Sequence, residues 1–195
     1  MSGPNSIRVA VLTVSDSAVS GTRQDVSGPA IRRRCEEVGW TVVKTATVPD
    51  EVNEIAGHLR EWADSEAATL ILTTGGTGVA PRDITPEATR SVLEREIPGL
   101  AELMRARGLE QTRYSALSRA VAGSRKNTLI VNLPGSPKGA LFSLETIADL
   151  VPHVIDLLAG ITGHGSDAKL STTTETLDLS ETSYEHEKPA ENKPR

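Results

Sequence analysis

Cysteine, aromatic residues and long hydrophobic runs are all scarce in this chain. A single cysteine among 195 residues excludes an internal disulfide and favours a reducing compartment, the cytoplasm. Cys35 lies at helical spacing from Ile31, which predicts a small core residue; the alternative is a nucleophile. Because the aromatic fraction is only 3%, the core must consist of Val, Ile, Leu and Ala, as in a sheet covered by helices.

Export and membrane signals are missing as well. The polar opening MSGPNS and the short β-branched run IRVAVLTV do not resemble a signal peptide. No segment approaches the roughly 20 apolar residues that a membrane span requires. We therefore expect a soluble protein without a membrane partner.

Positive charge is also limited. A net charge of -5 argues against a general nucleic-acid binder, which would carry a basic face. The histidines show no metal-ligand spacing, so we expect them on the surface or in the tail. They are His58, His153, His164 and His186.

Short β-branched runs alternate with helical patterns along the chain. The strand predictions are residues 7–14, 40–48, 68–73, 118–123 and 128–133. The helix predictions are residues 29–38, with Ile31, Cys35 and Val38 facing inward, then 52–62, a segment with Thr85 as N-cap and Pro86 as first residue, 141–148, and 152 to about 160. This alternation predicts a three-layer α/β fold with a mostly parallel sheet.

The character of the chain changes after residue 162. Residues 163–195 hold seven acidic and four basic residues, a net charge of -3, and show no apolar periodicity. We expect one domain at residues 1–162 and a disordered acidic tail that the chemistry does not need.

The segment TTGGTGVAPRDITPEA, residues 73–88, is rich in glycine directly after a predicted buried strand. Open α/β sheets hold their ligands at the carboxyl ends of their strands. Gly75, Gly76 and Gly78 leave backbone N–H groups free to surround a phosphate. The segment is neither a Walker loop nor a GxGxxG motif. The alternative is a tight turn into a helix.

Acidic residues follow three of the predicted strands. Asp83 comes after the glycines, Asp50 ends the second strand, and Ser15 and Asp16 end the first. A carboxylate beside a phosphate repels it unless a cation lies between them, and carboxylate and phosphate oxygens are the usual ligands of Mg²⁺. The alternatives are an Asx turn at Asp83 and a helix cap at Asp50.

A second loop, LPGSPKG at residues 133–139, also lies between a strand and a helix. Gly135 and the helix N-terminus predict a second anion site, with Lys138 adding positive charge. The alternative is an ordinary turn with a solvated lysine. The basic residues Arg119, Arg125 and Lys126 either bind phosphate or lie on a solvated hairpin.

Together these motifs resemble the molybdopterin adenylyltransferase family of molybdenum cofactor biosynthesis, the MogA/MoaB type. The resemblance runs from about residue 7 to 160 through LTVSDS, VPDE, LTTGGTGVAPRDITPEAT, LSRAVAG and NTLIVNLPGSPKG, in the family's order. The glycine and RDITPEA block is the most specific part. The family's LPGxP motif often has Asn or Gln where this chain has Ser136.

The resemblance implies a trimeric enzyme that uses MgATP to transfer AMP to the terminal phosphate of molybdopterin, with release of pyrophosphate. Asp83 and Asp50 match the family's two essential carboxylates and would hold Mg²⁺. The residues implied to line the substrate sites are Ser15, Asp16, Thr74, Gly75, Gly76, Thr77, Gly78, Gly135 and Ser136. The molybdate-inserting domain of the fused eukaryotic proteins is absent, so a separate protein would perform that step.

Two other functions remain open at this point. One is a carrier or scaffold that binds molybdopterin without adenylating it, although a carrier has little use for carboxylates beside phosphates. The other is a different nucleotide-dependent enzyme, for which the sequence offers no dedicated nucleophile.

Overall fold

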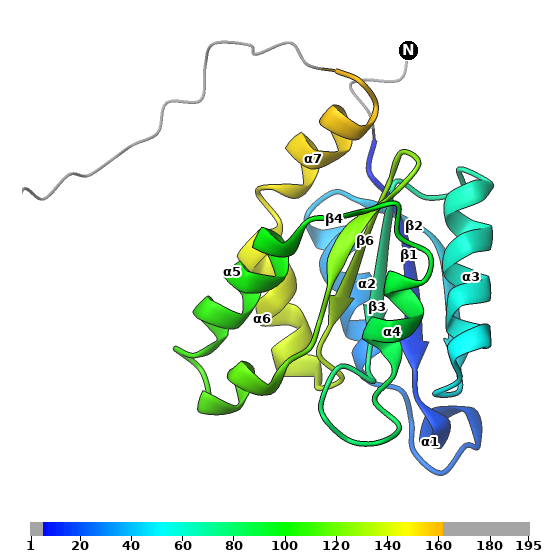
Figure 1. Ribbon diagram of the computed structural model, residues 1–195, viewed down its shortest axis with the longest axis vertical. Coiled ribbons are helices and arrows are strands. Elements are labelled where there is room, and N and C mark those ends of the chain that lie inside the picture. Colours follow the sequence, from blue (N-terminus) through cyan, green and yellow to red (C-terminus); the bar gives the residue numbers. More distant parts are fainter. Residues whose placement is uncertain (1–5, 162–195) are drawn as a thin grey trace, which may run out of the picture. The chain divides into compact units, whose positions relative to one another are not determined.

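The computed structural model describes residues 6–161 and contains a sheet with strand order β2-β1-β3-β6-β5-β4 (Figure 1). The first four of these strands are parallel, and β5 and β4 complete the sheet through antiparallel pairings. Their bounds are β1 Arg8–Val14, β2 Thr41–Val48, β3 Leu70–Thr74, β4 Arg95–Glu96, β5 Ala122–Arg125 and β6 Thr128–Leu133. The predicted mostly parallel α/β architecture is confirmed.

The three central strands β1, β3 and β6 are buried on both faces. Leu72 of β3 pairs with Val11 of β1 and with Val131 of β6, and all three are at most 1% exposed. Strands buried in this way read as continuous aliphatic runs, which is why the sequence pattern located them. Thr74 of β3 lies beside Leu133 of β6, so the carboxyl ends of these strands meet at one edge.

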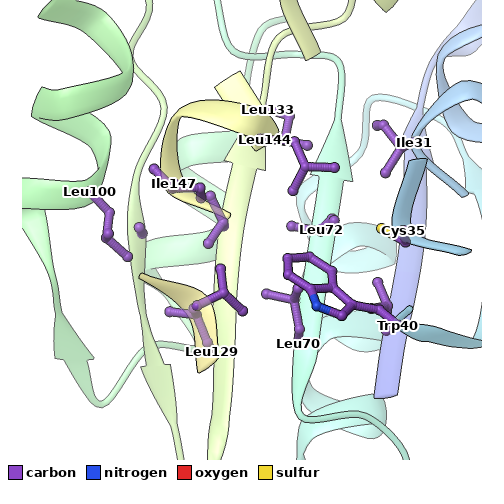
Figure 2. Packing of buried hydrophobic residues seen from close by; sticks show 14 of the residues in the cluster. Ile31, Cys35, Trp40, Leu70, Leu72, Leu100, Leu129, Leu133, Leu144 and Ile147 are labelled. Atoms are coloured by element: carbon purple, nitrogen blue, oxygen red, sulfur yellow. The ribbon is translucent and has the colours of Figure 1, made fainter. Parts of the chain in front are cut away.

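Helices cover both faces of the sheet. One face carries α2 (Ser27–Glu37), α5 (Pro98–Gly108), α6 (Pro137–Ile147) and α7 (Val151–Leu158); the other carries α3 (Val52–Asp64) and α4 (Thr85–Arg90). Figure 2 shows how Leu144 and Ile147 of α6 pack beside strand residues such as Leu129. Aliphatic side chains dominate both layers, as the low aromatic content predicted.

Cys35 is one of these core residues. It lies on α2, is completely buried, and contacts the cluster that includes Ile31 (Figure 2). Burial raises the pKa of its thiol to about 12, so the thiolate required of a nucleophile does not form at neutral pH. The prediction of a small core residue is confirmed.

The ends of two helices differ from the prediction. Helix α2 begins at Ser27, so Pro29 is its third residue, and Val38 is an exposed C-cap and not part of the inner stripe. A hydrophobic side chain at the helix end has turned out of the interface, because Gly39 adopts a positive φ and redirects the chain. The N-cap of α4 is Ile84, and Thr85 is its first residue.

Several elements were not predicted from the sequence. They are α1 (Asp16–Val19), β4, α5 and a 3₁₀ helix, η1 (Arg113–Leu117). Helix α5 had a readable signal, because Pro98 precedes Leu100, Ala101 and Met104 at helical spacing. The strand predicted at residues 118–123 begins later, at Ala122, and pairs antiparallel with β6 through a tight turn in which Lys126 has φ 49°.

Beneath the carboxyl edge, Asn132 joins four segments. This completely buried amide donates to the hydroxyls of Thr73 and Thr89, both at 2.9 Å, and accepts from the N–H of Val121 at 3.2 Å. These bonds connect β6 with β3, with α4 and with the chain entering β5. A buried polar group is stabilising only when its partners are present.

We therefore expect Asn132→Leu to lower the free energy of unfolding by about 3 kcal/mol, because it leaves one backbone N–H and two hydroxyls without their partner. Chemical denaturation measures this loss. The matched control is Asn53→Leu on the exposed surface of α3, which should change stability by less than about 0.5 kcal/mol. Equal losses of unfolding free energy in both variants would show that the hydrogen bonds of Asn132 do not stabilise the fold.

Two other predictions concern the surface. No helix within residues 6–161 is long and apolar enough to cross a membrane. His58 and His153 lie at the surface, and the His58 ring lies edge-on to Trp62 at 5.5 Å. His164, His186 and the predicted acidic tail lie outside the described residues.

Candidate functional site

The glycine turn after β3 is built so closely against its neighbours that side chains do not fit. Gly75 has φ +105°, and a Cβ there would lie 2.2 Å from the carbonyl oxygen of Val14. Gly76 has φ +61°, and a Cβ there would lie 2.4 Å from Oγ1 of Thr85. The left-handed backbone and the close packing both require glycine. The turn exposes backbone where the strands β1 and β3 end.

Hydroxyl groups of flanking threonines hold this turn. Thr85 donates its hydroxyl to the carbonyl of Gly75 at 2.9 Å and its N–H to the carbonyl of Gly76 at 3.1 Å. Thr74 donates to the carbonyl of Pro134 at 2.8 Å, which ties the turn to the second loop. A Cβ on Gly135 would lie only 3.2 Å from Cα of Gly75. The two predicted anion loops are therefore in contact.

The two candidate carboxylates lie against this same turn. Oδ1 of Asp50 is 3.0 Å from the position that a Cβ would take on Gly76, and Oδ2 of Asp83 is 2.8 Å from that of Gly78. Asp83 also accepts from the N–H of Ala80 at 2.7 Å and so closes the loop between these residues. This bond runs to a residue before the aspartate, so it is not the Asx turn considered as an alternative, in which the donor lies two residues after it. Glycine leaves room on the backbone for both carboxylates.

Asp16 joins the same edge through reciprocal contacts with Asp50. The N–H of each residue donates to the carboxylate of the other, at 2.9 and 3.0 Å. Arg82 binds both carboxylate oxygens of Asp16, at 2.9 and 3.0 Å, and reaches Glu51 at 2.9 Å. The arrangement connects the ends of β1 and β2 with the segment before α4 through exposed ion pairs.

The pKa values of Asp16 and Asp50 are shifted in opposite directions. Hydrogen bonds from Arg82 hold the pKa of Asp16 below its ordinary value. Desolvation by burial raises the pKa of Asp50, and the nearby negative charges of Asp16 and Asp83 act in the same direction. Arg82 lowers the pKa of Asp50 as well, but burial outweighs it and the net shift is upward. A partly buried carboxylate next to other acidic groups is typical of a functional site.

The opposite shifts give a test of stability against pH. The pKa of Asp50 is higher in the folded protein than its ordinary value of 3.8. The contribution of this carboxyl group to stability is therefore full below pH 3.8 and is lost as the pH rises through the folded pKa. Asp50→Asn should therefore melt at a higher temperature than the wild type at about pH 7, and the difference should vanish near about pH 3.

Asp16→Asn is the matched comparison for this test. The folded pKa of Asp16 is lowered, so its contribution is full above the ordinary value and is lost as pH falls through the folded pKa. This variant should melt below the wild type at about pH 7, with the difference closing in acid. Shifts of the same sign in both variants, measured by calorimetry, would contradict the assigned electrostatics.

Two cavities flank the contact between the glycine turn and the second loop. The larger, about 570 Å³, lies between this turn, Asp83, α5, η1 and the start of α6. The smaller, about 410 Å³, lies beside the ends of β1 and β3 and the segment before α2. Gly135 and Ser136 line both cavities. Two ligands could thus approach one turn from opposite sides.

Most predicted site residues line these cavities, whereas Asp16 and Asp50 line neither of them. Thr77 and Lys138 line the larger cavity, whereas Ser15 lines the smaller one. Ser136 is the N-cap of α6 and accepts from the N–H of Gly139 at 3.2 Å. Lys138 is exposed and has no ion pair within the described part of the chain. It is a cation available to an incoming anion.

Two of the basic residues considered as phosphate ligands lie elsewhere. Arg125 binds both carboxylate oxygens of Asp64, at 2.8 and 2.9 Å, and Lys126 contacts the same residue. They form the turn before β6 and so lie at the amino end of the parallel strands, opposite the glycine turn. The use of Arg125 in the site was wrong, because the antiparallel hairpin carries it to the far edge.

Other wall residues escaped the sequence reasoning. Ser27 donates to the carbonyl of Gly135 at 2.7 Å, and Asp25 accepts from Thr13 at 2.7 Å and from the N–H of Gly28 at 3.0 Å. Tyr114 of η1 lines the larger cavity. The one sequence signal for Asp25 and Ser27 was their position within four residues before Pro29, where capping residues mark the start of a helix.

The carboxylates alone do not make a complete metal site. No cluster of three or more His, Cys, Asp or Glu side chains able to hold a metal occurs among residues 6–161. Mg²⁺, however, usually retains waters and binds one or two carboxylates together with substrate phosphates. Asp83, which follows the glycine turn, and Asp50, which lies against it from the end of β2, fit that mode.

Comparison with known proteins agrees with this geometry. Residues 10–153 match the model of a family described as a probable molybdopterin binding domain. The chain is 46% identical over 157 residues to the Drosophila melanogaster molybdenum cofactor synthesis protein cinnamon, covering 78% of this chain but only 26% of that longer protein. It is 40% identical over 156 residues to the molybdopterin adenylyltransferase of Helicobacter pylori strain J99, covering 79% of this chain and 89% of the relative.

A solved structure has the same fold. The molybdopterin biosynthesis enzyme MoaB of Thermus thermophilus superposes with a TM-score of 0.75 at 55% sequence identity, over 79% of this chain and 97% of that one. The family match covers most of the chain, and it includes both loops and all the carboxylates described above. The protein therefore belongs to the molybdopterin-binding domain family of molybdenum cofactor biosynthesis.

Proposed function

We propose that the protein is a molybdopterin adenylyltransferase that transfers AMP from ATP to the terminal phosphate of molybdopterin. The observation that carries this proposal is the pair of cavities that meet at one glycine turn, with Asp83 lining the larger cavity and Asp50 lying against Gly76. An enzyme that joins two phosphorylated substrates needs two pockets with their phosphates at a shared point. The names of the full-length relatives support the same reaction.

In this reaction an oxygen of the molybdopterin phosphate attacks the α-phosphorus of ATP. A new phosphorus–oxygen bond forms, the bond to the β-phosphate oxygen breaks, and pyrophosphate leaves with the electron pair. Both reactants are polyanions, so the protein must mainly align them and offset their charge. Neither step requires a covalent intermediate on the protein, in agreement with the inert Cys35 thiol.

The residues of the turn would divide this work. The backbone N–H groups of Gly76, Thr77 and Gly78 would donate to phosphate oxygens. That of Gly75, which was expected to be free, donates instead to the carbonyl of Leu133. Lys138 and the N-terminus of α6, next to Ser136, would offset negative charge on the other side of the contact. Asp50 and Asp83 would hold Mg²⁺, which supplies positive charge between the phosphates when it is bound.

Incubation of the protein with molybdopterin, Mg²⁺ and ATP labelled in the α-phosphate tests the proposal. We expect label on the pterin and one pyrophosphate released for each transfer. Tight pterin binding without transfer would instead indicate a carrier, and ATP turnover without pterin would indicate another nucleotide-dependent enzyme. Omission of Mg²⁺ provides the control for metal dependence.

We further propose a cytoplasmic homotrimer that passes its product to a separate molybdate-inserting protein. This part of the proposal rests on the family resemblance. Analytical ultracentrifugation of the full chain tests this expectation. A trimer would give a molar mass three times that of one chain of 20.7 kDa.

A further inference from the structure

Arg119 lies between η1 and β5 and contacts three separate parts of the glycine turn. Its Nε donates to the carbonyl of Gly78 at 2.6 Å, and its Nη2 donates to the carbonyl of Asp83. Its backbone N–H donates to the carbonyl of Thr77 at 2.9 Å. Glu87 of α4 binds the same guanidinium through both carboxylate oxygens. One side chain thus connects the beginning and the end of the segment that carries Asp83.

The contacts of Arg119 differ from those expected of a phosphate ligand. All three guanidinium nitrogens donate to protein oxygens, and the carboxylate of Glu87 offsets the positive charge. Lys138, in contrast, lines the larger cavity and is exposed without an ion pair in the described part of the chain. Lys138 can therefore offer its positive charge to a phosphate, whereas the guanidinium of Arg119 is already bound to protein oxygens.

Besides Arg119, the segment between Gly78 and Asp83 is held by Arg82, whose ion pairs to Asp16 and Glu51 tie it to the ends of β1 and β2. Its internal contacts are two bonds between Ala80 and Asp83, at 2.7 and 2.9 Å. Residues 79–82 are exposed, and Val79 has 67% of its surface accessible. A planar guanidinium can hold two carbonyls at a fixed separation because its donors form a rigid fork. Arg119 therefore joins the two ends of this segment, Gly78 and Asp83, to each other.

We propose that Arg119 is a positioning residue that holds the Asp83 segment against the glycine turn so that the carboxylate can receive the metal of the nucleotide. The proposal rests on the proposed function. Partners of this kind behind a metal-binding group usually change metal affinity by about 10- to 100-fold when they are removed.

The test uses the full chain with Arg119→Ala and Arg119→Lys. ATP affinity is measured by calorimetry with Mg²⁺ and with EDTA, and amide hydrogen exchange is followed over residues 77–83. For Arg119→Ala we expect the Mg²⁺-dependent part of ATP affinity to fall about tenfold, unchanged affinity in EDTA, and faster exchange in the segment. Arg119→Lys should lie between alanine and wild type, since one ammonium group cannot bind both carbonyls as the fork does.

The matched control is Arg90→Ala on α4, which breaks a comparable exposed ion pair to Glu96 at 3.1 Å without touching the turn. It should behave as wild type in both measurements. Equal loss of ATP affinity with Mg²⁺ and with EDTA in Arg119→Ala would make Arg119 a phosphate ligand and overturn the proposal. If Arg119→Ala does not fold, a wild-type result for Arg119→Lys overturns it equally.

Failure of this inference is distinguishable from failure of the proposed function. If the wild type transfers AMP and Arg119→Ala matches it in Mg²⁺-dependent ATP affinity and exchange, only the role of Arg119 is wrong. If the wild type transfers no AMP but the segment still exchanges faster in Arg119→Ala, the proposed function fails and the positioning contact stands.

Discussion

Asp83→Asn is expected to lower AMP transfer about a thousandfold, a loss of ~4 kcal/mol of transition-state stabilisation. The carboxylate lies against the turn at Gly78, where the phosphates of the two substrates are proposed to meet. An amide of the same shape cannot supply negative charge to a metal ion. Transfer of labelled AMP under saturating substrates measures the effect.

The same variant should keep its fold. Asparagine retains an oxygen that can accept the N–H of Ala80, the contact that Asp83 makes at 2.7 Å. Thermal unfolding and pterin binding should therefore remain close to those of the wild type. Asp149→Asn, at an exposed position between α6 and α7, is the control and should transfer AMP normally. Wild-type activity of Asp83→Asn with intact pterin binding would remove Asp83 from the mechanism.

The second large effect is expected from Gly75→Ala. An alanine must adopt φ +105° and place its Cβ 2.2 Å from the carbonyl oxygen of Val14, so β1 and β3 must separate or the turn must move. Strained backbone of this kind costs about 1–3 kcal/mol before the steric clash is counted. We expect a loss of at least about 3 kcal/mol in unfolding free energy together with loss of ATP binding.

Gly57→Ala on α3 is the matched control for this substitution. A Cβ at Gly57 meets no atom within 4 Å, and the residue lies on the exposed side of a helix. The same chemical change should therefore stabilise the protein by about 0.5–1 kcal/mol. Chemical denaturation compares the two variants directly. A stable Gly75→Ala protein that binds ATP would show that the turn does not need bare backbone.

Much of the edge that carries the site could be anticipated from the chain. Parallel strands bring their carboxyl ends to one side, so residues after β1, β2 and β3 were expected to meet there. The structure accordingly brings Asp16 against Asp50. It also places Asp50 and Asp83 against the glycine turn that follows β3. Their roles in binding and catalysis stay predictions. Thr74, expected to line a substrate pocket, lines the smaller cavity, and its hydroxyl donates to the carbonyl of Pro134.

The walls of the larger cavity were less accessible to sequence reasoning. Helix α5 has a weak stripe in which Leu100 and Met104 face the core, and η1 is a single short turn that packs on it. Tyr114 reaches the cavity only because of that packing. Short elements depend on tertiary contacts more than on local preference, so their position does not follow from local pattern.

The amino-acid sequence by itself determined the long strands and most of the helices and the positions where bare backbone is needed, because periodicity and glycine conformation are local properties. Only the tertiary structure decided which arginine meets which acid. Arg119 binds Gly78 and Glu87, which are 41 and 32 residues away in the sequence. Arg125 pairs instead with Asp64 at the opposite edge of the sheet. Such choices depend on distance and burial, which arise when segments remote in sequence pack together.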